Sequence, residues 1–165
     1  MFGPMKAVRS APKLDQAGVE RALQRLRQLV KDRGLKASEV RETIARAVLA
    51  VDGHFSIDEL MENLPDAHTA TVYRVIPLLV EAGLIQQAPA AGDQSGHRYE
   101  RAFEREHHDH LVCISCQKVV EFHFETFETL QRDVAERFGF SLTGHVHELF
   151  GVCGSCQKKS AKAAR

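Results

Sequence analysis

The sequence lacks long apolar runs, tryptophan and any formal net charge at neutral pH. A membrane-spanning helix needs roughly 18 or more consecutive apolar residues, and because no such run occurs we expect no membrane partner. Residues 1–20 hold no apolar run long enough for the h-region of a secretory leader, so we expect a cytoplasmic protein. The composition, 44% hydrophobic and 27% charged over 165 residues, is typical of a globular chain with one domain or two small ones.

Cysteine is also scarce. The four cysteines form two matched C-x-x-C pairs, Cys113 with Cys116 and Cys153 with Cys156. Two cysteines at this spacing present both sulfurs to one ion, and zinc accepts four thiolates in a tetrahedral arrangement. The alternatives are disulfides, which need an oxidising compartment, or a redox-active pair. Since a cytoplasmic protein is expected, structural zinc held by all four cysteines is the leading hypothesis.

Metal-binding residue types crowd the segment just before the first cysteine pair. Residues 106–110 read Glu-His-His-Asp-His, and Glu121 follows shortly after the pair. A hydrophobic core has no need of three histidines and a carboxylate in succession. The run therefore predicts metal binding beyond the four cysteines.

The neutral total hides an uneven distribution of charge. Residues 1–36 contain nine lysines and arginines against three acidic residues, a net of +6, whereas residues 104–157 contain four basic against nine acidic residues, a net of −5. The basic part favours a polyanionic partner such as nucleic acid, and the acidic, histidine-rich part favours cations. On charge alone, a solvated helix face would also account for the basic residues.

Three helices are expected in the first part of the chain. Residues typical of helix N-caps occur at Asp15, Ser38 and Ser56, and Ser56 forms a capping-box pattern with Glu59. Apolar residues follow each N-cap at helical spacing until a glycine or a proline ends the helix. The second helix is expected to turn Val40 inward, one turn before its other core residues.

A fourth helix and a hairpin would complete a winged helix-turn-helix. Thr69 is expected to cap the helix over residues 69–82, in which Pro77 predicts a kink near residues 75–76. The wing is expected as two strands around a glycine-rich turn, at 84–88, 97–101 and 89–96.

The rest of the chain predicts a small module of helix and sheet. Strands are expected over 109–114, 118–124 and 141–150, and a helix over 126–138. Three strands and one helix form too small a core to stand alone comfortably, so a homodimer is expected. The predicted class is α+β, with a flexible basic arm (1–14), a winged-helix DNA-binding domain (15–101), a hinge (102–104), a dimerisation and metal-binding domain (105–157) and a basic, disordered tail (158–165).

Five motifs, in this order and spacing, resemble those of the ferric uptake regulator (Fur) family of bacterial metal-dependent repressors. They are ATVYRV (70–75), RYE (98–100), HHDHLVCxxCxKVVEF (107–122), LTGH (142–145) and GVCxxC (151–156), and the resemblance covers residues 16–157. It implies a winged-helix DNA reader, a dimerisation domain with a four-cysteine structural zinc, and one or two further metal sites.

The resemblance also implies site residues. A regulatory site for Fe(II), Mn(II) or Zn(II), ions that accept nitrogen and oxygen donors, would consist of His54, Glu100, His108, His110 and Glu121. A second metal site would consist of His107, Asp109, Glu128 and His145. Because side chains alternate along a strand, one His-His-Asp-His run can serve both sites.

These assignments suggest a mechanism. His54 and Glu100 belong to the DNA-binding half, so sharing a metal with the other half would fix the spacing of two recognition helices on a double-stranded operator. The residues expected to face the major groove are Thr69, Thr71, Tyr73 and Arg74. We predict a repressor of metal-uptake genes that senses Fe(II) or Mn(II), with no enzymatic activity and no small organic substrate.

Other interpretations stay open. Within the family, a peroxide-sensing regulator and then a zinc-uptake regulator are the alternatives. Outside it, a zinc-dependent hydrolase would use H-x-H-x-D-H, but Arg105 stands at the first position of that pattern. A zinc-storage or interaction module would have no use for a helix-turn-helix and a wing.

Overall fold

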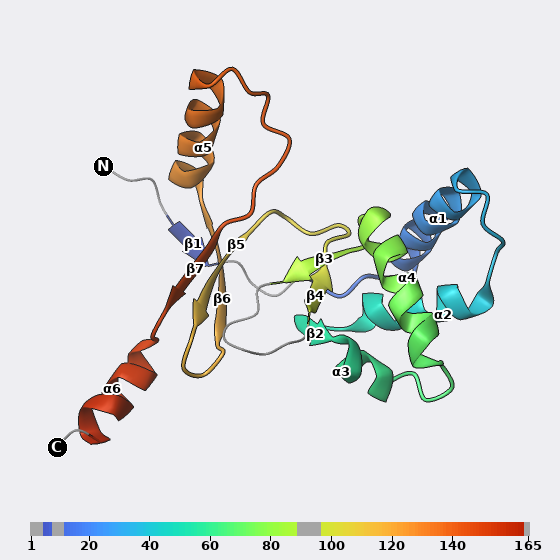
Figure 1. The fold of residues 1–165 in the computed structure, drawn as a ribbon, viewed down its shortest axis with the longest axis horizontal. Coiled ribbons are helices and arrows are strands. Elements are labelled where there is room, and N and C mark those ends of the chain that lie inside the picture. The colour runs from blue at the N-terminus through green and yellow to red at the C-terminus, as the bar shows by residue number, and fades with distance from the viewer. Residues whose placement is uncertain (1–4, 8–11, 89–96, 164–165) are drawn as a thin grey trace. The chain divides into compact units, whose positions relative to one another are not determined.

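The computed structural model describes residues 5–7, 12–88 and 97–163, which form two compact units that divide between Arg105 and Glu106. We call residues 12–88 and 97–105 the N-terminal unit, and residues 5–7 and 106–163 the C-terminal unit. Figure 1 labels their helices and strands. In the described part of the chain, no helix is both long and apolar enough to cross a membrane.

The N-terminal unit is a winged helix-turn-helix, as predicted (Figure 1). Its strands form an antiparallel three-stranded sheet in the order β2-β4-β3. The elements are α1 (Gln16–Asp32), α2 (Glu39–Ala50), β2 (His54–Ser56), α3 (Ile57–Glu62), α4 (Thr69–Glu81), β3 (Ile85–Ala88) and β4 (Arg98–Arg101).

The predicted starts of the first three helices are confirmed by hydrogen bonds from the capping side chains. Asp15 Oδ1 accepts the amide of Gly18 at 2.7 Å, and Ser38 Oγ accepts an amide of the first turn of α2 at 3.4 Å. At α3 the capping box is complete, since Ser56 Oγ accepts the Glu59 amide at 3.1 Å and the Glu59 carboxylate accepts the Ser56 amide at 2.7 Å. These bonds satisfy amides that the helices leave without partners.

One apolar core joins the four helices to the wing. Leu23 of α1, Leu60 of α3 and Leu79 of α4 are fully buried, and Phe55 and Tyr99 extend the core into the sheet with ring centroids 6.0 Å apart. Each fully buried leucine contributes about 2 kcal/mol to folding. This core fixes β2 and β4 against the helices.

Two predictions for the helices of this unit are wrong. Val40 is 48% exposed, because the buried stripe of α2 begins one turn later, at Ile44. Thr69 is not a cap: the carbonyl of His68 already accepts the amides of Thr71 and Val72, so His68 is the N-cap and Thr69 is the first helical residue.

Strand β2 was not predicted. Residues 54–56 pair with β4 and make the sheet three-stranded. Helix α4 contains Pro77 in its interior, although this residue has no amide to donate, and the kink expected near residues 75–76 stays a prediction. The predicted glycine-rich turn at 89–96 lies outside the described residues.

The C-terminal unit is built on a four-stranded sheet in the order β1-β6-β5-β7. β7 runs parallel to β5, and the other pairs are antiparallel. Figure 1 shows α5 and α6 projecting from this sheet. The elements are β1 (Met5–Ala7), β5 (Asp109–Cys113), β6 (Val119–Phe124), α5 (Glu125–Arg137), β7 (Glu148–Gly151) and α6 (Gly154–Ala163).

Three expectations for this unit are corrected. Residues 5–7 of the predicted loose arm pair with β6, while residues 1–4 and 8–11 lie outside the described part. The strand predicted over 141–150 is confined to β7, because residues 141–147 form an irregular segment instead. The predicted disordered tail is helix α6 up to Ala163, since alanine, lysine and glutamine favour helices.

Candidate metal centres and nucleic-acid face

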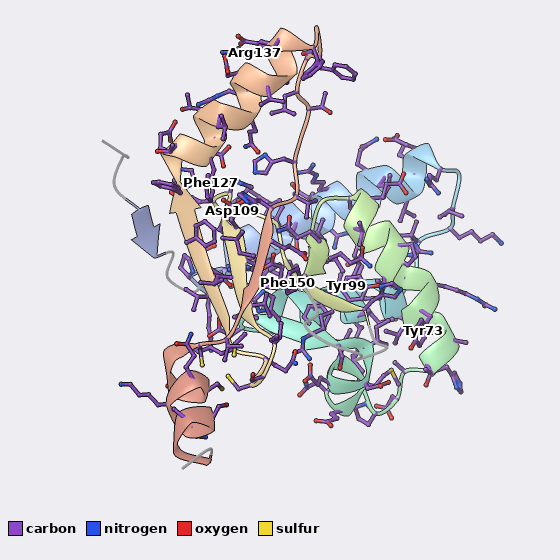
Figure 2. All side chains as sticks on the ribbon, turned by 60° about the vertical axis from the view of Figure 1, so that its left-hand side comes forward. Tyr73, Tyr99, Asp109, Phe127, Arg137 and Phe150 are labelled. Carbon is purple, nitrogen blue, oxygen red and sulfur yellow. The ribbon has the colours of Figure 1, made fainter. Side chains whose placement is uncertain are left out.

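The four cysteines gather at one end of the C-terminal sheet. Cys113 ends β5 and Cys153 follows β7, and the parallel pairing of these two strands brings both C-x-x-C pairs together. Their sulfur atoms all lie within 4.8 Å of one another, and Cys116 Sγ lies 3.7 Å from Cys153 Sγ. Figure 2 shows these sulfurs beside the start of α6. Tetrahedral zinc with bonds of about 2.3 Å separates its thiolates by about 3.8 Å, so this cluster has the right size.

The acidities of these thiols differ because of their neighbours. The Cys153 amide donates to Cys113 Sγ at 3.2 Å and, with amides of the first pair, lowers the pKa of Cys113 to about 6. The nearby sulfur of Cys153, followed by that of Cys116, raises the pKa of Cys156 to about 12. Four thiols this close cannot all ionise without a cation among them. The donor set therefore fits a divalent metal.

A second group of donors lies wholly within the C-terminal unit and consists of His107, Asp109, Glu128 and His145. His107 Nε2 lies 2.7 Å from His145 Nε2, 3.2 Å from Glu128 Oε1 and 3.5 Å from Asp109 Oδ1. In tetrahedral coordination with bonds of about 2.0–2.1 Å, donor atoms are about 3.3 Å apart. The four side chains are thus already spaced as one coordination shell.

The environment of Asp109 is the strongest indication that this group of side chains can bind a metal. Its side chain is 1% exposed, yet neither carboxylate oxygen has a hydrogen-bond partner, and Glu128 Oε1 also lacks one. A buried carboxylate without a partner is costly, and a divalent cation between these oxygens and the two imidazoles removes that cost. Figure 2 labels Asp109 at the start of β5.

Gln131 supports two of these donors and was not predicted. Its Nε2 donates to Glu128 Oε2 at 2.7 Å and lies 2.9 Å from His145 Nδ1. Polar contacts of this kind orient metal ligands. Gln131 stands one helical turn after Glu128 on α5, and this spacing could have revealed it in the sequence.

In the N-terminal unit, His54 and Glu100 face each other across β2 and β4. They are register partners, and His54 Nε2 lies 3.3 Å from Glu100 Oε2. The Glu100 side chain is fully buried; its Oε1 accepts from Gln86 Nε2 at 2.8 Å, and its Oε2 accepts from Arg105. Sequence reasoning missed both partners, although Gln86 stands directly opposite Glu100 in the β3–β4 hairpin.

In the C-terminal unit, His110 faces Glu121 across β5 and β6 in the same manner. His108 packs against His110 with ring centroids 4.9 Å apart. The carbonyl of Glu106, 3.0 Å from His108 Nδ1, can only accept, so that nitrogen carries the proton and Nε2 is the nitrogen with a lone pair. Each unit thus presents a histidine and a glutamate as a cross-strand pair.

Helix α4 exposes the residues predicted to contact DNA. Val72, Val75 and Leu79 pack inward, whereas Thr69 and Arg74 are exposed and Thr71 is half-buried. Tyr73 is 55% exposed and lies on α4, as labelled in Figure 2. A helix with one face in the core and hydroxyl and guanidinium groups on the other can enter a major groove.

Comparisons with known proteins agree with this architecture. The model of the ferric uptake regulator family matches residues 32–150. The ferric uptake regulation protein of Campylobacter jejuni is 35% identical over 146 residues, which cover 85% of this chain and 91% of that protein.

Solved structures are also similar. The Helicobacter pylori ferric uptake regulator, described as having three functional metal-binding sites, superimposes with a TM-score of 0.72 at 30% identity, over 89% of this chain and 97% of the other. A zinc uptake regulator complexed with zinc and DNA gives a TM-score of 0.53 at 25% identity, over 89% and 99%. The similarity therefore extends over both units.

Proposed function

Because the chain belongs to the ferric uptake regulator family, we propose that it is a metal-responsive, DNA-binding transcriptional repressor of metal-uptake genes in the bacterial cytoplasm. The observation that carries this proposal is the cross-strand pair of His54 and Glu100, because it gives a helix-turn-helix unit two metal donors of its own. A DNA reader that is itself part of a metal site can have an affinity for DNA that depends on metal.

The regulatory metal site is proposed to take donors from both units. His54 and Glu100 would share a divalent cation with His108, His110 and Glu121. Shared coordination would restrict the angle between reader and dimerisation module, and in a dimer it would match the spacing of two α4 helices to two half-sites. If the bound metal favoured the conformation with this restricted angle by about 3 kcal/mol, the affinity for DNA would change roughly a hundredfold.

Fe(II) or Mn(II) is the proposed signal. The five regulatory donors are imidazole and carboxylate groups, which these ions accept. All four cysteines of the chain lie in the other cluster, so no sulfur is left to favour zinc at the regulatory site. We assign Zn(II) to the four cysteines as a structural ion, and a further metal to His107, Asp109, Glu128 and His145.

A homodimer is proposed through the apolar face of α5. This helix has no buried residue, and Leu130, Val134 and Phe138 are 57%, 47% and 76% exposed. A groove of about 540 Å³ lies between this face and residues 140, 142 and 147. Apolar surface of this extent marks a protein interface, and a second copy would cover it.

Metal-dependent DNA binding is the direct test. A duplex selected from a random pool with Mn(II)-loaded protein serves as the operator, and its binding is titrated with and without Mn(II). His54→Ala should abolish the roughly hundredfold stimulation and leave a folded dimer, because it removes one donor from the surface of the reader. His97→Ala, an exposed histidine of the same unit, is the matched control. Equal Mn(II) stimulation in His54→Ala and wild type would refute the proposed regulatory site.

A further inference from the structure

Glu100 already has a cationic partner within its own unit. Its carboxylate is completely buried and forms an ion pair with Arg105, whose side chain is only 6% exposed. Water therefore solvates neither charge well, and their pairing offsets part of the cost of burying them. Arg105 lies five residues after Glu100, directly beyond β4, so the pair is formed by a short segment of the N-terminal unit.

The two partners of Glu100 contact different oxygens. Gln86 donates to Oε1, whereas Arg105 Nη1 donates to Oε2. Oε2 is also the oxygen that lies 3.3 Å from His54 Nε2. Arg105 thus holds the carboxylate oxygen that faces the histidine.

A metal bridging His54 and Glu100 needs that same oxygen. A cation bonded to His54 Nε2 and Glu100 Oε2 at about 2.0–2.2 Å occupies the space beside Oε2. A guanidinium and a divalent cation on the same oxygen repel each other at such short range, so each weakens the binding of the other.

We propose that Arg105 is an internal competitor of the regulatory metal. Its guanidinium holds Glu100 when metal is scarce and leaves Oε2 when a divalent cation binds, so it raises the metal concentration at which the protein responds. The proposal rests on the proposed regulatory site and adds to it a residue that sets the sensing threshold.

Arg105→Gln tests the competition in the full-length protein with its structural zinc retained. Affinity for Mn(II) is measured by competition with a fluorescent chelator, and the rise in melting temperature with Mn(II) is recorded alongside. Without the guanidinium, Mn(II) affinity should increase about tenfold or more, since a charge-assisted hydrogen bond no longer has to break. The metal-induced rise in melting temperature should also be larger, because the metal-free protein has lost its ion pair.

Two further variants keep the test decisive. Arg105→Lys retains the charge and should bind Mn(II) like wild type. Arg33→Gln removes an arginine from an exposed ion pair of the same unit, 2.8 Å from Glu81, and should leave Mn(II) affinity unchanged.

The outcomes distinguish a failure of the proposed role of Arg105 from a failure of the proposed regulatory site. Equal or weaker Mn(II) binding by Arg105→Gln would overturn the competition and make Arg105 a support of the ligand. Combining Arg105→Gln with His54→Ala should abolish the gain. If His54→Ala alone left Mn(II) affinity intact, the proposed regulatory site itself would be wrong.

Discussion

In the N-terminal unit a continuous apolar core reaches from α1 to the wing, whereas the buried apolar residues described in the C-terminal unit are only Val112, Cys113 and Phe122. What the C-terminal unit does bury are His108, Asp109 and His110, which are metal-binding residue types. A small sheet with so little apolar burial needs another source of stability. The comparison teaches that one unit is held by its apolar core, whereas the other has too little apolar burial for this, and we propose that bound metal and a second copy stabilise it.

The largest effect should follow from loss of the four-cysteine site. Cys153→Ser should release zinc, unfold the C-terminal unit and dissociate the dimer, because structural zinc contributes on the order of 10 kcal/mol to small zinc domains. Helical circular dichroism from the N-terminal unit should persist. Zinc content, gel filtration and circular dichroism measure these three outcomes.

Ser115→Ala, an exposed change within the first C-x-x-C pair, is the control and should keep both zinc and dimer. A stable, zinc-free dimer of the Cys153→Ser variant would show that the comparison between the units is mistaken.

A cavity in the N-terminal core should be the next largest effect. Leu23→Ala removes a fully buried side chain and should cost about 2–5 kcal/mol. Because this core contains no metal donor, the loss should be the same with and without a chelator. Urea unfolding followed by helix signal measures it, and Leu35→Ala, 43% exposed in the wild type, should change little. A cost that depended on zinc would mean that the two units are not stabilised independently.

Asp109→Asn should separate metal binding from stability inside the C-terminal unit. Removing a buried carboxylate without hydrogen bonds should stabilise the protein lacking this metal by about 1 kcal/mol. The same change should reduce the rise in melting temperature on adding a divalent metal, because one of the two proposed histidine and carboxylate sites loses a strong ligand. Thermal unfolding at several metal concentrations measures both the stability of the metal-free variant and its response to metal. An undiminished rise would exclude Asp109 as a ligand.

The smallest effect concerns the capping box of α3. Ser56→Ala removes the hydroxyl that accepts the Glu59 amide and should cost about 1 kcal/mol. Since Ser56 ends β2 two residues after His54, the change also asks whether helix stability affects metal binding. We expect unfolding to shift in urea while Mn(II) affinity stays unchanged. Weakened Mn(II) binding would instead couple the cap to the site.

The elements that local signals determine were predictable from the sequence. Asp15, Ser38 and the Ser56–Glu59 pair each marked a helix start, and the structure contains the expected hydrogen bonds. β2 was missed because it has only three residues and gains its identity from pairing with β4. Such partners lie 46 residues apart, as His54 and Glu100 do in register, and no local pattern encodes them.

In the candidate sites, too, local features were predictable and long-range contacts were not. Donor types could be recognised in the sequence because metal chemistry restricts them to few residues. Gln86 and Arg105 could not, since glutamine and arginine are common on surfaces and only the fold brings them to Glu100. Gln131 differs, because it stands three residues after Glu128 on one helix. The segment before β7 misled prediction because its alternating apolar residues resemble a strand, although it serves as the irregular stretch that carries His145.

The parallel pairing of β5 with β7 has a consequence for biosynthesis. Cys113 and Cys153 meet only through strands that are far apart in the chain, so the four-thiol cluster cannot assemble until Cys156 has left the ribosome. The N-terminal unit contains all its own strands and helices by residue 105 and can fold while the remainder is still being translated. A nascent chain would thus acquire its DNA-reading surface before its means of pairing.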